Sequence, residues 1–298
     1  MSVSVYRRAA QAIAQADAVL ITAGAGMGVD SGLPDFRGNE GFWKAYPPMA
    51  KLGLCFTDLA NPEWFDSDPC FAWGFYGHRL NLYRQTTPHK GYDILREGLL
   101  ENKSVFVFTS NVDGHFQKAG WDPKSVAEVH GSIHYIQPVA PFLVPAGIDN
   151  LGKKLIQPAE DLELEVDEST FRVKEEDLPL ITIDNQQYDA RPNILQFGDA
   201  RWLSIRTDRQ LDRYKRWKNE NDKRTHNHCV IDIGSGSAVP TCRMEAESHS
   251  YQTRCPLIRI NPREPRVPVS KEGDPDRIGI SEGAVEALEK IYEEFRQV

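Results

Sequence analysis

The sequence predicts an α/β fold in which a Rossmann-like, mostly parallel sheet carries a second, smaller domain built from two insertions. The first observation is a set of four short apolar runs, each as long as a buried strand and each ending at glycines or polar residues. The second is that helical patterns lie between some of these runs and close the chain at 283–296. Buried strands that alternate with helices are typical of a parallel sheet. The four runs are Ala18–Thr22, Ser104–Phe108, Cys229–Ile233 and Leu257–Ile260.

The smaller domain is predicted from two segments that interrupt this alternation. Residues 39–89 are rich in Trp, Phe, Tyr and Pro and contain helix-like stretches. Residues 138–190 contain Pro, many acidic residues and short alternating stretches that look like small strands. We expect these two insertions to pack together. The larger domain then comprises residues 1–38, 90–137 and 191–298.

Composition narrows the range of partners. The chain has 298 residues and a formal net charge of -8, which argues against nucleic acid because phosphate binding needs concentrated Lys and Arg. No run approaches the roughly 18 apolar residues of a membrane span. The five cysteines are scattered and form no C-x-x-C pair, so neither a disulfide framework nor a cysteine zinc site is predicted. The first residues show no signal-peptide core. We therefore expect a cytoplasmic protein without nucleic-acid or membrane partners.

Candidate ligand-binding residues follow the ends of the predicted strands, where ligands bind in open α/β sheets. Gly24, Ala25 and Gly26 come directly after the first run, and glycines there let backbone N–H groups approach a pyrophosphate. The G-x-G-x-x-G spacing fails at Val29, so a plain tight turn explains this stretch alone equally well. Residues 31–38 (SGLPDFRG) then place an aromatic ring and a guanidinium on a loop.

Taken together, residues 24–38 (GAGMGVDSGLPDFRG) resemble the signature of the sirtuin family. Further stretches match in the family's order, and the resemblance runs from about residue 18 to 265. It is weakest across 138–190. Several ordered motifs over that distance are far more specific than any one of them. The later matches are TSNVD at 109–113 with 115–120, EVHG at 128–131, RPN at 191–193 with FGD at 197–199, GSGSAVP at 234–240 and INPRE at 260–264.

The resemblance implies three catalytic residues. Asn111 and Asp113 would hydrogen-bond the nicotinamide carboxamide of NAD, one side chain donating and the other accepting. His130 would be the general base that activates a ribose hydroxyl, a task that suits an ordinary pKa near 6.5. Structural alternatives exist for two of them. His130 can be a hydrogen-bonded structural histidine, and Asp113 can cap the helix that follows. His134 is expected to be structural.

The resemblance also assigns residues to NAD. Phe36 would cover the reacting face and exclude water, and Arg37 would stabilise the closed loop and the phosphates. Asp35 either belongs to the cofactor site or holds the loop through local hydrogen bonds. The remaining NAD-binding positions are Gly24, Ala25, Gly26 and Ser110, then Gly234, Ser235 and Ser237 at the phosphates or ribose, and Asn261 and Glu264 at the adenosine ribose.

The acyl-lysine peptide would bind at two places. Phe197 and Gly198 belong to the stretch that resembles the family's substrate loop. Tyr76 and Arg79 lie three residues apart and hence on one helical face. Sirtuins that prefer acidic acyl groups carry a similar Tyr-x-x-Arg, which binds the acyl carboxylate. The alternative is an ordinary buried aromatic beside an arginine whose charged head reaches water.

The chain departs from the family at several positions. Gly28 stands where the family usually has Ser, Ser110 where it has Gln, and Asp199 where it has Glu. The two C-x-x-C pairs of the family's zinc ribbon are missing, because residues 131–190 contain no cysteine. We therefore expect no zinc. The module would be held by side-chain packing of Leu162, Leu164, Phe171, Val173 and Leu178.

The sequence thus predicts an NAD-dependent protein-lysine deacylase that releases nicotinamide and O-acyl-ADP-ribose. It would act as a deacetylase, or as a desuccinylase or demalonylase if Tyr76 and Arg79 bind an acidic acyl group. The substituted Ser110 and Gly28 keep open a sirtuin-like NADase or ADP-ribosyltransferase. A non-catalytic NAD or ADP-ribose sensor is the third alternative.

Overall fold

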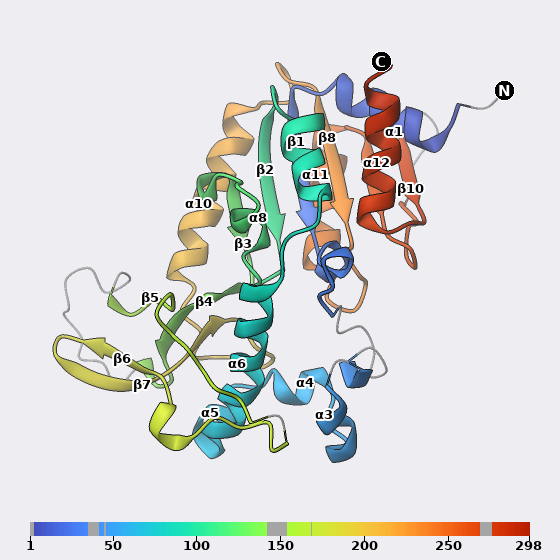
Figure 1. Cartoon of the computed structure of the whole chain (residues 1–298). Coiled ribbons are helices and arrows are strands. Elements are labelled where there is room, and N and C mark those ends of the chain that lie inside the picture. The colour runs from blue at the N-terminus through green and yellow to red at the C-terminus, as the bar shows by residue number, and fades with distance from the viewer. Residues whose placement is uncertain (1–2, 35–41, 45, 142–153, 168, 269–275) are drawn as a thin grey trace.

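A six-stranded parallel sheet forms the larger layer of the molecule (Figure 1). The computed structural model describes residues 3–34, 42–44, 46–141, 154–167, 169–268 and 276–298. The strand order is β10-β9-β8-β1-β2-β3, and every neighbouring pair is parallel. The predicted fold class is confirmed, and all four apolar runs are strands of this sheet. The strands are β1 Ala18–Ala23, β2 Ser104–Thr109, β3 Val126–Glu128, β8 His228–Ile233, β9 Leu257–Ile260 and β10 Arg277–Ile280.

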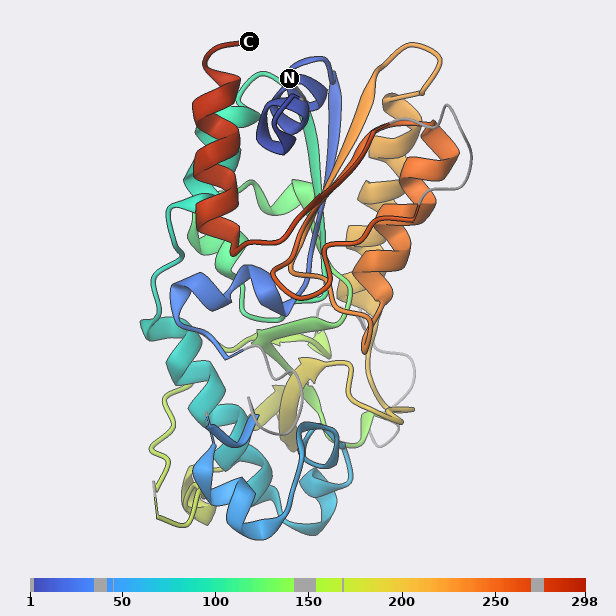
Figure 2. The same cartoon turned by 90° about the vertical axis from the view of Figure 1, so that its right-hand side faces the viewer.

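Helices cover both faces of this sheet, as Figure 2 shows. Side chains alternate along β1, so that Val19 and Ile21 enter the core beneath α1 and α12, and Ala18 and Leu20 enter the core beneath α10 and α11. A strand buried on both faces has to be apolar throughout, which explains the continuous run in the sequence. The helices are α1 Val5–Ala14, α7 Gly91–Asp93, α8 His115–Lys118 and α12 Ala284–Phe295 on one face, and α10 Ile205–Glu220 and α11 Thr241–Thr253 on the other.

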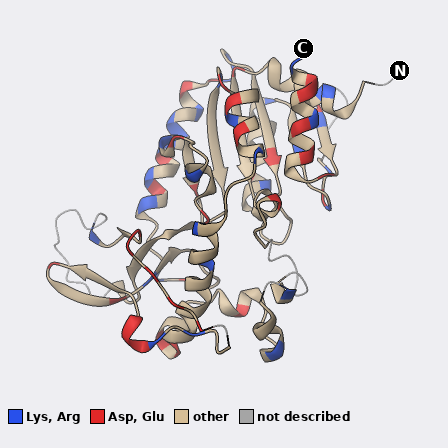
Figure 3. Cartoon of the chain, in the orientation of Figure 1, with Lys and Arg blue, Asp and Glu red and all other residues tan. Residues whose placement is uncertain are grey.

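Helix α10 shows how a strongly charged segment still contributes to the core. Its buried residues Thr207, Gln210, Tyr214 and Trp217 recur every three or four positions and therefore share one helical face. The rest of the helix carries both basic and acidic side chains (Figure 3). The Nε1–H of Trp217 donates a hydrogen bond to the Oγ of Ser104 at 2.9 Å, which joins α10 to the beginning of β2.

A second unit is built on a four-stranded antiparallel sheet in the order β5-β4-β7-β6. Helices from the first insertion pack against this sheet, and the helices and the sheet contribute to one aromatic-rich core that includes Phe75, Tyr76 and Ile181. The elements of this unit are α3 Pro47–Leu52, α4 Phe56–Leu59, α5 Trp64–Ser67, α6 Pro69–Gln85, β4 Gly131–Pro138, β5 Gln157–Pro158, β6 Leu180–Ile183 and β7 Gln186–Ile194. The proposed domain boundaries stay a prediction. Strand β4 pairs within the second sheet, although those boundaries keep residues up to 137 with the larger domain.

The six parallel strands all end at the edge of the sheet that faces the second unit (Figure 1). The chain passes from one unit to the other at this edge, because β3 ends at Glu128 and β4 begins at Gly131. Loops that follow β1, β2, β3 and β8 therefore meet between the two sheets. The three predicted catalytic residues, Asn111, Asp113 and His130, lie in these loops.

Candidate active site

Two glycine turns that are far apart in the sequence pack backbone against backbone at this edge. A Cβ atom at Gly24 would lie 2.7 Å from the oxygen of Gly234, and one at Gly26 would lie 2.6 Å from the Cα of Gly234. Gly234 itself has a φ of 66°, a conformation that favours glycine. The N–H of Gly24 donates to the oxygen of Ile233 at 3.0 Å, and that of Gly26 donates to the oxygen of Gly234 at 3.2 Å. These glycines therefore provide close packing, and their N–H groups already have partners within the protein.

The loop after β2 is fixed by hydrogen bonds to this turn. The buried Asn111 donates from Nδ2 to the oxygen of Gly24 at 3.0 Å, which holds the side-chain amide in one orientation. Asp113 Oδ1 accepts a hydrogen bond from the N–H of His115 at 2.9 Å, but the N-cap of α8 is Gly114, so Asp113 does not occupy the expected capping position. The Nε2 of His134 lies 2.8 Å from the oxygen of Asp113, and because that oxygen accepts, Nε2 carries the proton. His134 thus supports the backbone of Asp113.

His130 lies at the turn between β3 and β4. The next residue, Gly131, has a φ of 82°, and a side chain there would overlap the backbone of Asn193. The only hydrogen bond of the His130 ring to a described residue joins Nε2 and Thr241 Oγ1, which are 3.3 Å apart. Burial lowers the pKa of His130 below its ordinary value, so the ring is neutral at pH 7.

The two late motifs form one hydrogen-bonded loop. Asn261 is fully buried. Its Nδ2 donates to the oxygen of Ser235 and its Oδ1 accepts from the N–H of Glu264, each at 3.0 Å. Ser237 Oγ donates to Glu264 Oε1 at 3.1 Å. Arg243 then holds the other oxygen of Glu264 at 3.0 Å. By contrast, the buried hydroxyl of Ser235 has no hydrogen-bond partner among the described residues.

Three predicted cofactor residues, Asp35, Phe36 and Arg37, lie outside the described residues. Ala25 and Ser110 stand where they were expected, in the turns after β1 and β2. Two residues that sequence reasoning did not single out also lie here. Thr241 contacts the His130 ring, and Cys242 Sγ accepts a hydrogen bond from the N–H of Ser110 at 3.1 Å. A Thr-Cys pair at the start of a helix has no distinctive sequence signal.

The predicted acyl-binding residues lie on α6 in the second unit. Arg79 is buried, and the rings of Phe56, Phe75, Tyr76 and Tyr83 lie 5.3–5.7 Å from its guanidinium carbon. The Nε and Nη2 groups of Arg79 both donate to the hydroxyl of Tyr83, at 3.1 and 2.8 Å. Tyr83 was not predicted from the sequence. Its spacing of four residues from Arg79 on one helix is the signal that could have identified it.

Phe197 and Gly198 form an open turn beside this cluster. Gly198 has a φ of 68°, and a Cβ there would have no atom within 4 Å. Phe197 is partly exposed, and its ring lies 6.2 Å from that of Phe56 in an edge-on arrangement. Asp199 forms a fully buried ion pair with Arg191 of β7, which fixes the base of the turn. Phe56 therefore touches both the Arg79 cluster and the predicted substrate loop.

The chain is similar in sequence to known proteins. A curated relative from Danio rerio, named NAD-dependent protein deacylase sirtuin-5, mitochondrial, is 31% identical over 208 residues. A relative from Saccharolobus solfataricus, named NAD-dependent protein deacetylase, is 36% identical over 131 residues. A family model described as the Sir2 family matches residues 24–141. The chain belongs to the Sir2, or sirtuin, family.

The matches to these relatives are partial in length. The alignment with the Danio rerio protein covers 67% of this sirtuin and 64% of that protein. The alignment with the Saccharolobus solfataricus protein covers 43% of this sirtuin and 48% of that protein. The chain thus spans about half to two thirds of the length of these curated relatives. A solved structure titled as a Sir2 homolog–NAD complex superimposes with a TM-score of 0.64 at 22% sequence identity. That alignment covers 97% of this chain and 93% of the solved one, which shows the shared fold.

The second unit of this sirtuin is held by a hydrophobic core. Leu164, Phe171 and Val173 are buried, with Leu162 and Leu178 packed against the same cluster, as predicted from the sequence. Gly74 of α6 lies so close to the backbone of Phe171 that no side chain fits at that position. Within the described ranges, no group of three or more His, Cys, Asp or Glu side chains could hold a metal ion. The absence of zinc stays a prediction.

In the described ranges, no helix is long and apolar enough to cross a membrane.

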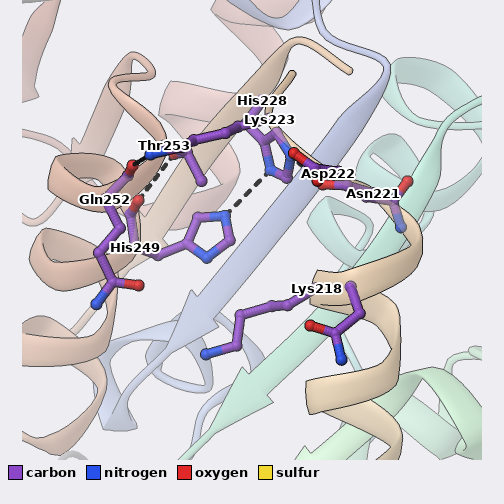
Figure 4. Close-up of a pocket in the computed structure, with 9 residues that line it drawn as sticks. Lys218, Asn221, Asp222, Lys223, His228, His249, Gln252 and Thr253 are labelled. Carbon is purple, nitrogen blue, oxygen red and sulfur yellow. Dashed lines mark hydrogen bonds between the residues drawn. The ribbon is translucent and has the colours of Figure 1, made fainter. Parts of the chain in front are cut away.

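A pocket of ≈ 430 Å³ lies at the opposite end of the large sheet, where β8 begins (Figure 4). His228 and His249 line it, with Nδ1 of the first 3.1 Å from Nε2 of the second. The Nε2–H of His228 donates to the oxygen of Asn221 at 2.6 Å, so the Nδ1 of His228 must accept from His249. Burial lowers the pKa of both rings, that of His249 to about 3. This pair is structural.

Proposed function

We propose that this sirtuin is an NAD-dependent protein-lysine deacylase. The observation that carries the proposal is that Asn111, Asp113 and His130 occupy adjoining loops at the carboxyl edge of the parallel sheet, beside the glycine turns after β1 and β8. Ligands bind at this edge in open α/β sheets. The names of the two curated relatives, a protein deacetylase and a protein deacylase that depend on NAD, support the same activity.

The residues at this edge fit a dinucleotide. Gly24, Gly26 and Gly234 bring the turns after β1 and β8 into backbone contact at the edge of the sheet where ligands bind. Ser235 has a buried hydroxyl without a hydrogen-bond partner in the described part of the chain, and such a group costs about 1–3 kcal/mol when it stays unpaired. A phosphate or ribose oxygen would satisfy it. Ser237 and Glu264 lie at the rim of the same loop.

NAD supplies the ribose that receives the acyl group and nicotinamide as the leaving group. One NAD, one acyl-lysine and one water then give nicotinamide, lysine and O-acyl-ADP-ribose. Asn111, whose amide is held by Gly24, would donate to the carboxamide oxygen of nicotinamide, and Asp113 would accept from its NH₂ group. His130 would take the proton from the attacking ribose hydroxyl. The ring is suited to this because burial keeps it neutral at pH 7.

The activity is tested by identifying the products made from NAD in the presence and absence of an acyl-lysine peptide. We expect O-acyl-ADP-ribose that forms only with the peptide, in equal amount to free nicotinamide. Free ADP-ribose with the acyl-lysine left intact would favour an NADase or ADP-ribosyltransferase, which the substituted Ser110 and Gly28 motivate. NAD that stays intact under both conditions would contradict the proposal and favour a sensor.

The Arg79 cluster supports a finer proposal, a preference for acidic acyl groups such as succinyl or malonyl. A buried guanidinium can hold a carboxylate through two parallel charge-assisted hydrogen bonds, which a neutral acetyl group cannot form. Tyr83 holds Nε and Nη2 of Arg79, and this fixes the plane of the guanidinium. Tyr76 packs on Phe65 at a centroid distance of 5.7 Å, so its ring is also fixed beside Arg79.

This selectivity is tested by the ratio of kcat/KM for succinyl and acetyl versions of one peptide. We expect the wild type to favour the succinyl peptide and Arg79→Met to lose about tenfold or more of that ratio, the equivalent of a charge-assisted hydrogen bond. Acetyl activity should change little, because Arg79 takes no part in the chemistry at ribose. A wild type without the preference, or a variant that loses both activities equally, would make Arg79 a structural residue.

A further inference from the structure

The first two residues of α11 join the His130 ring to the ends of the central strands. Thr241 Oγ1 lies 3.3 Å from His130 Nε2. Its neighbour Cys242 is fully buried, and its sulfur accepts from the N–H of Ser110 at 3.1 Å and lies 3.3 Å from the oxygen of Ala23. One helix start therefore contacts the last residue of β1, the loop after β2 and the histidine after β3.

Cys242 fixes the position of this helix start. Burial raises the pKa of its thiol to about 12, so the group stays protonated and can donate to the oxygen of Ala23. The same oxygen accepts from the N–H of Ser110 at 3.1 Å and from the hydroxyl of Thr109 at 2.9 Å. Because these contacts hold α11 against both central strands, Thr241 has a defined position relative to the loops of the candidate site.

We propose that Thr241 is a positioning residue for His130: its hydroxyl orients the imidazole and stabilises the imidazolium that forms when His130 accepts a proton. This inference rests on the proposed function, in which His130 is the general base. A threonine hydroxyl both donates and accepts, so it can bond Nε2 in either neutral tautomer. Once the ring is protonated, both nitrogens carry N–H, and Nε2–H donates to Thr241 Oγ1 in a stronger, charge-assisted bond.

The contact matters because the surroundings otherwise disfavour the imidazolium. Burial is the cause that lowers the pKa of His130, and no other ring hydrogen bond to a described residue opposes it. A general base also has to be held in a fixed orientation, and a third group that orients it is a recurring feature of such sites. Thr241 occupies that place here, 111 residues away from His130 in the sequence.

The test compares Thr241→Val, which replaces the hydroxyl by a methyl group, with Thr241→Ser, which keeps the hydroxyl. Thr253→Val is the matched control, because it makes the same change at the other end of α11, where the hydroxyl bonds to the oxygen of His249. For each variant, kcat for deacylation and the rate of nicotinamide exchange are measured. Exchange reports the earlier step, in which His130 does not act.

We expect Thr241→Val to lower kcat for deacylation about tenfold. This loss is smaller than the whole contribution of a general base, which is about 10²–10⁴-fold. Nicotinamide exchange and the KM for NAD should stay at the wild-type values. Thr241→Ser should restore most of kcat, and Thr253→Val should change none of the three quantities.

Wild-type kcat in Thr241→Val would overturn the inference, as would an equal loss of deacylation and exchange, which would indicate a general structural effect. Failure of Thr241→Ser to restore kcat would also overturn it. Failure of the proposed function itself looks different. In that case the wild type forms no O-acyl-ADP-ribose, or His130→Ala deacylates normally, and both proposals fall together.

Discussion

Histidines lie at both ends of the large parallel sheet, buried at the amino end and partly buried at the carboxyl end, and their surroundings differ. At the amino end, His228 and His249 hydrogen-bond each other, and His228 also donates to the oxygen of Asn221. At the carboxyl end, His130 has a single ring contact among the described residues, at 3.3 Å to Thr241. Burial lowers the pKa at both ends. Burial alone therefore does not distinguish a structural histidine from a candidate base, whereas the hydrogen-bond partners do.

The two ends of the sheet also differ in what holds them together. The carboxyl end is built from glycines whose main chains touch, so its shape depends on the absence of side chains. The amino end is built from side chains that satisfy one another. We infer that changes to polar side chains at the carboxyl end alter catalysis or cofactor binding, whereas changes to the touching glycines there, or to the paired side chains at the amino end, alter stability.

The largest expected effect is that of Gly234→Ala. Gly234 has a φ of 66°, and an added Cβ would overlap the backbone of Gly26 and Met27. We expect the free energy of unfolding to fall on the order of 3–5 kcal/mol and NAD binding to be lost. Gly53→Ala is the control, because Gly53 also has a positive φ, 69°, but no atom lies within 4 Å of the added Cβ. That variant should lose about 1–2 kcal/mol. Urea unfolding measures both, and equal losses would refute the packing argument.

The next effect is that of His249→Ala at the amino end. The change removes the hydrogen-bond donor to His228 Nδ1 and leaves a cavity beside Trp217, whose ring stacks on His249 at 5.9 Å. We expect the free energy of unfolding to fall by about 2–3 kcal/mol, measured in urea, with kcat unchanged at a temperature where the variant is folded. A loss of kcat without a loss of stability would break the comparison between the two ends.

A smaller effect is expected in the pH dependence of deacylation. His130 acts as a base only when neutral, so activity falls as the pH drops through its pKa. Because burial lowers that pKa, the acidic limb of kcat/KM should lie below about 6.5, the ordinary value for histidine. The pH profile of the wild type, measured over the range in which the protein stays folded, gives the position of the limb. An acidic limb at or above the ordinary value would mean that another group, or a more solvated His130, controls the rate.

The smallest effect, no change at all, is expected for removal of metal. A hydrophobic core that includes Leu164, Phe171 and Val173 holds the second unit, and residues 131–190 contain no cysteine. The midpoint of thermal unfolding should therefore be the same with and without a strong chelator. Stoichiometric zinc by elemental analysis, or a lower midpoint in chelator, would contradict this.

The strands of the large sheet could be predicted because buried parallel strands are continuous apolar runs. One of these runs contains an acidic residue, Asp232. Its buried carboxylate is tolerated because Thr22 and Arg259 on the neighbouring strands hydrogen-bond it. β3 has three residues and β10 begins with a charged one, so neither stands out from its surroundings. A strand could therefore be predicted from the sequence only where it is long enough and apolar throughout.

The candidate site could be predicted as residue types but not as contacts. The glycine motifs identify Gly24, Gly26 and Gly234, but their packing against one another joins positions about two hundred residues apart. The same holds for the contact between Thr241 and His130. The ribose-binding role of Asn261 stays a prediction, and the hydrogen bonds of its side chain to Ser235 and Glu264 could not be read from the sequence. Hydrogen bonds of this kind depend on the relative placement of loops, which no local pattern encodes.

The central claim is that His130 is the base at the carboxyl end of the sheet. His130→Ala tests it most directly when deacylation and nicotinamide exchange are measured on the same preparation. The account predicts that deacylation falls by about 10²–10⁴-fold, while exchange and NAD binding persist, because the base acts after the cofactor is bound and nicotinamide has left. Deacylation within a few-fold of the wild type would contradict the account, and so would an equal loss of both activities in a folded protein.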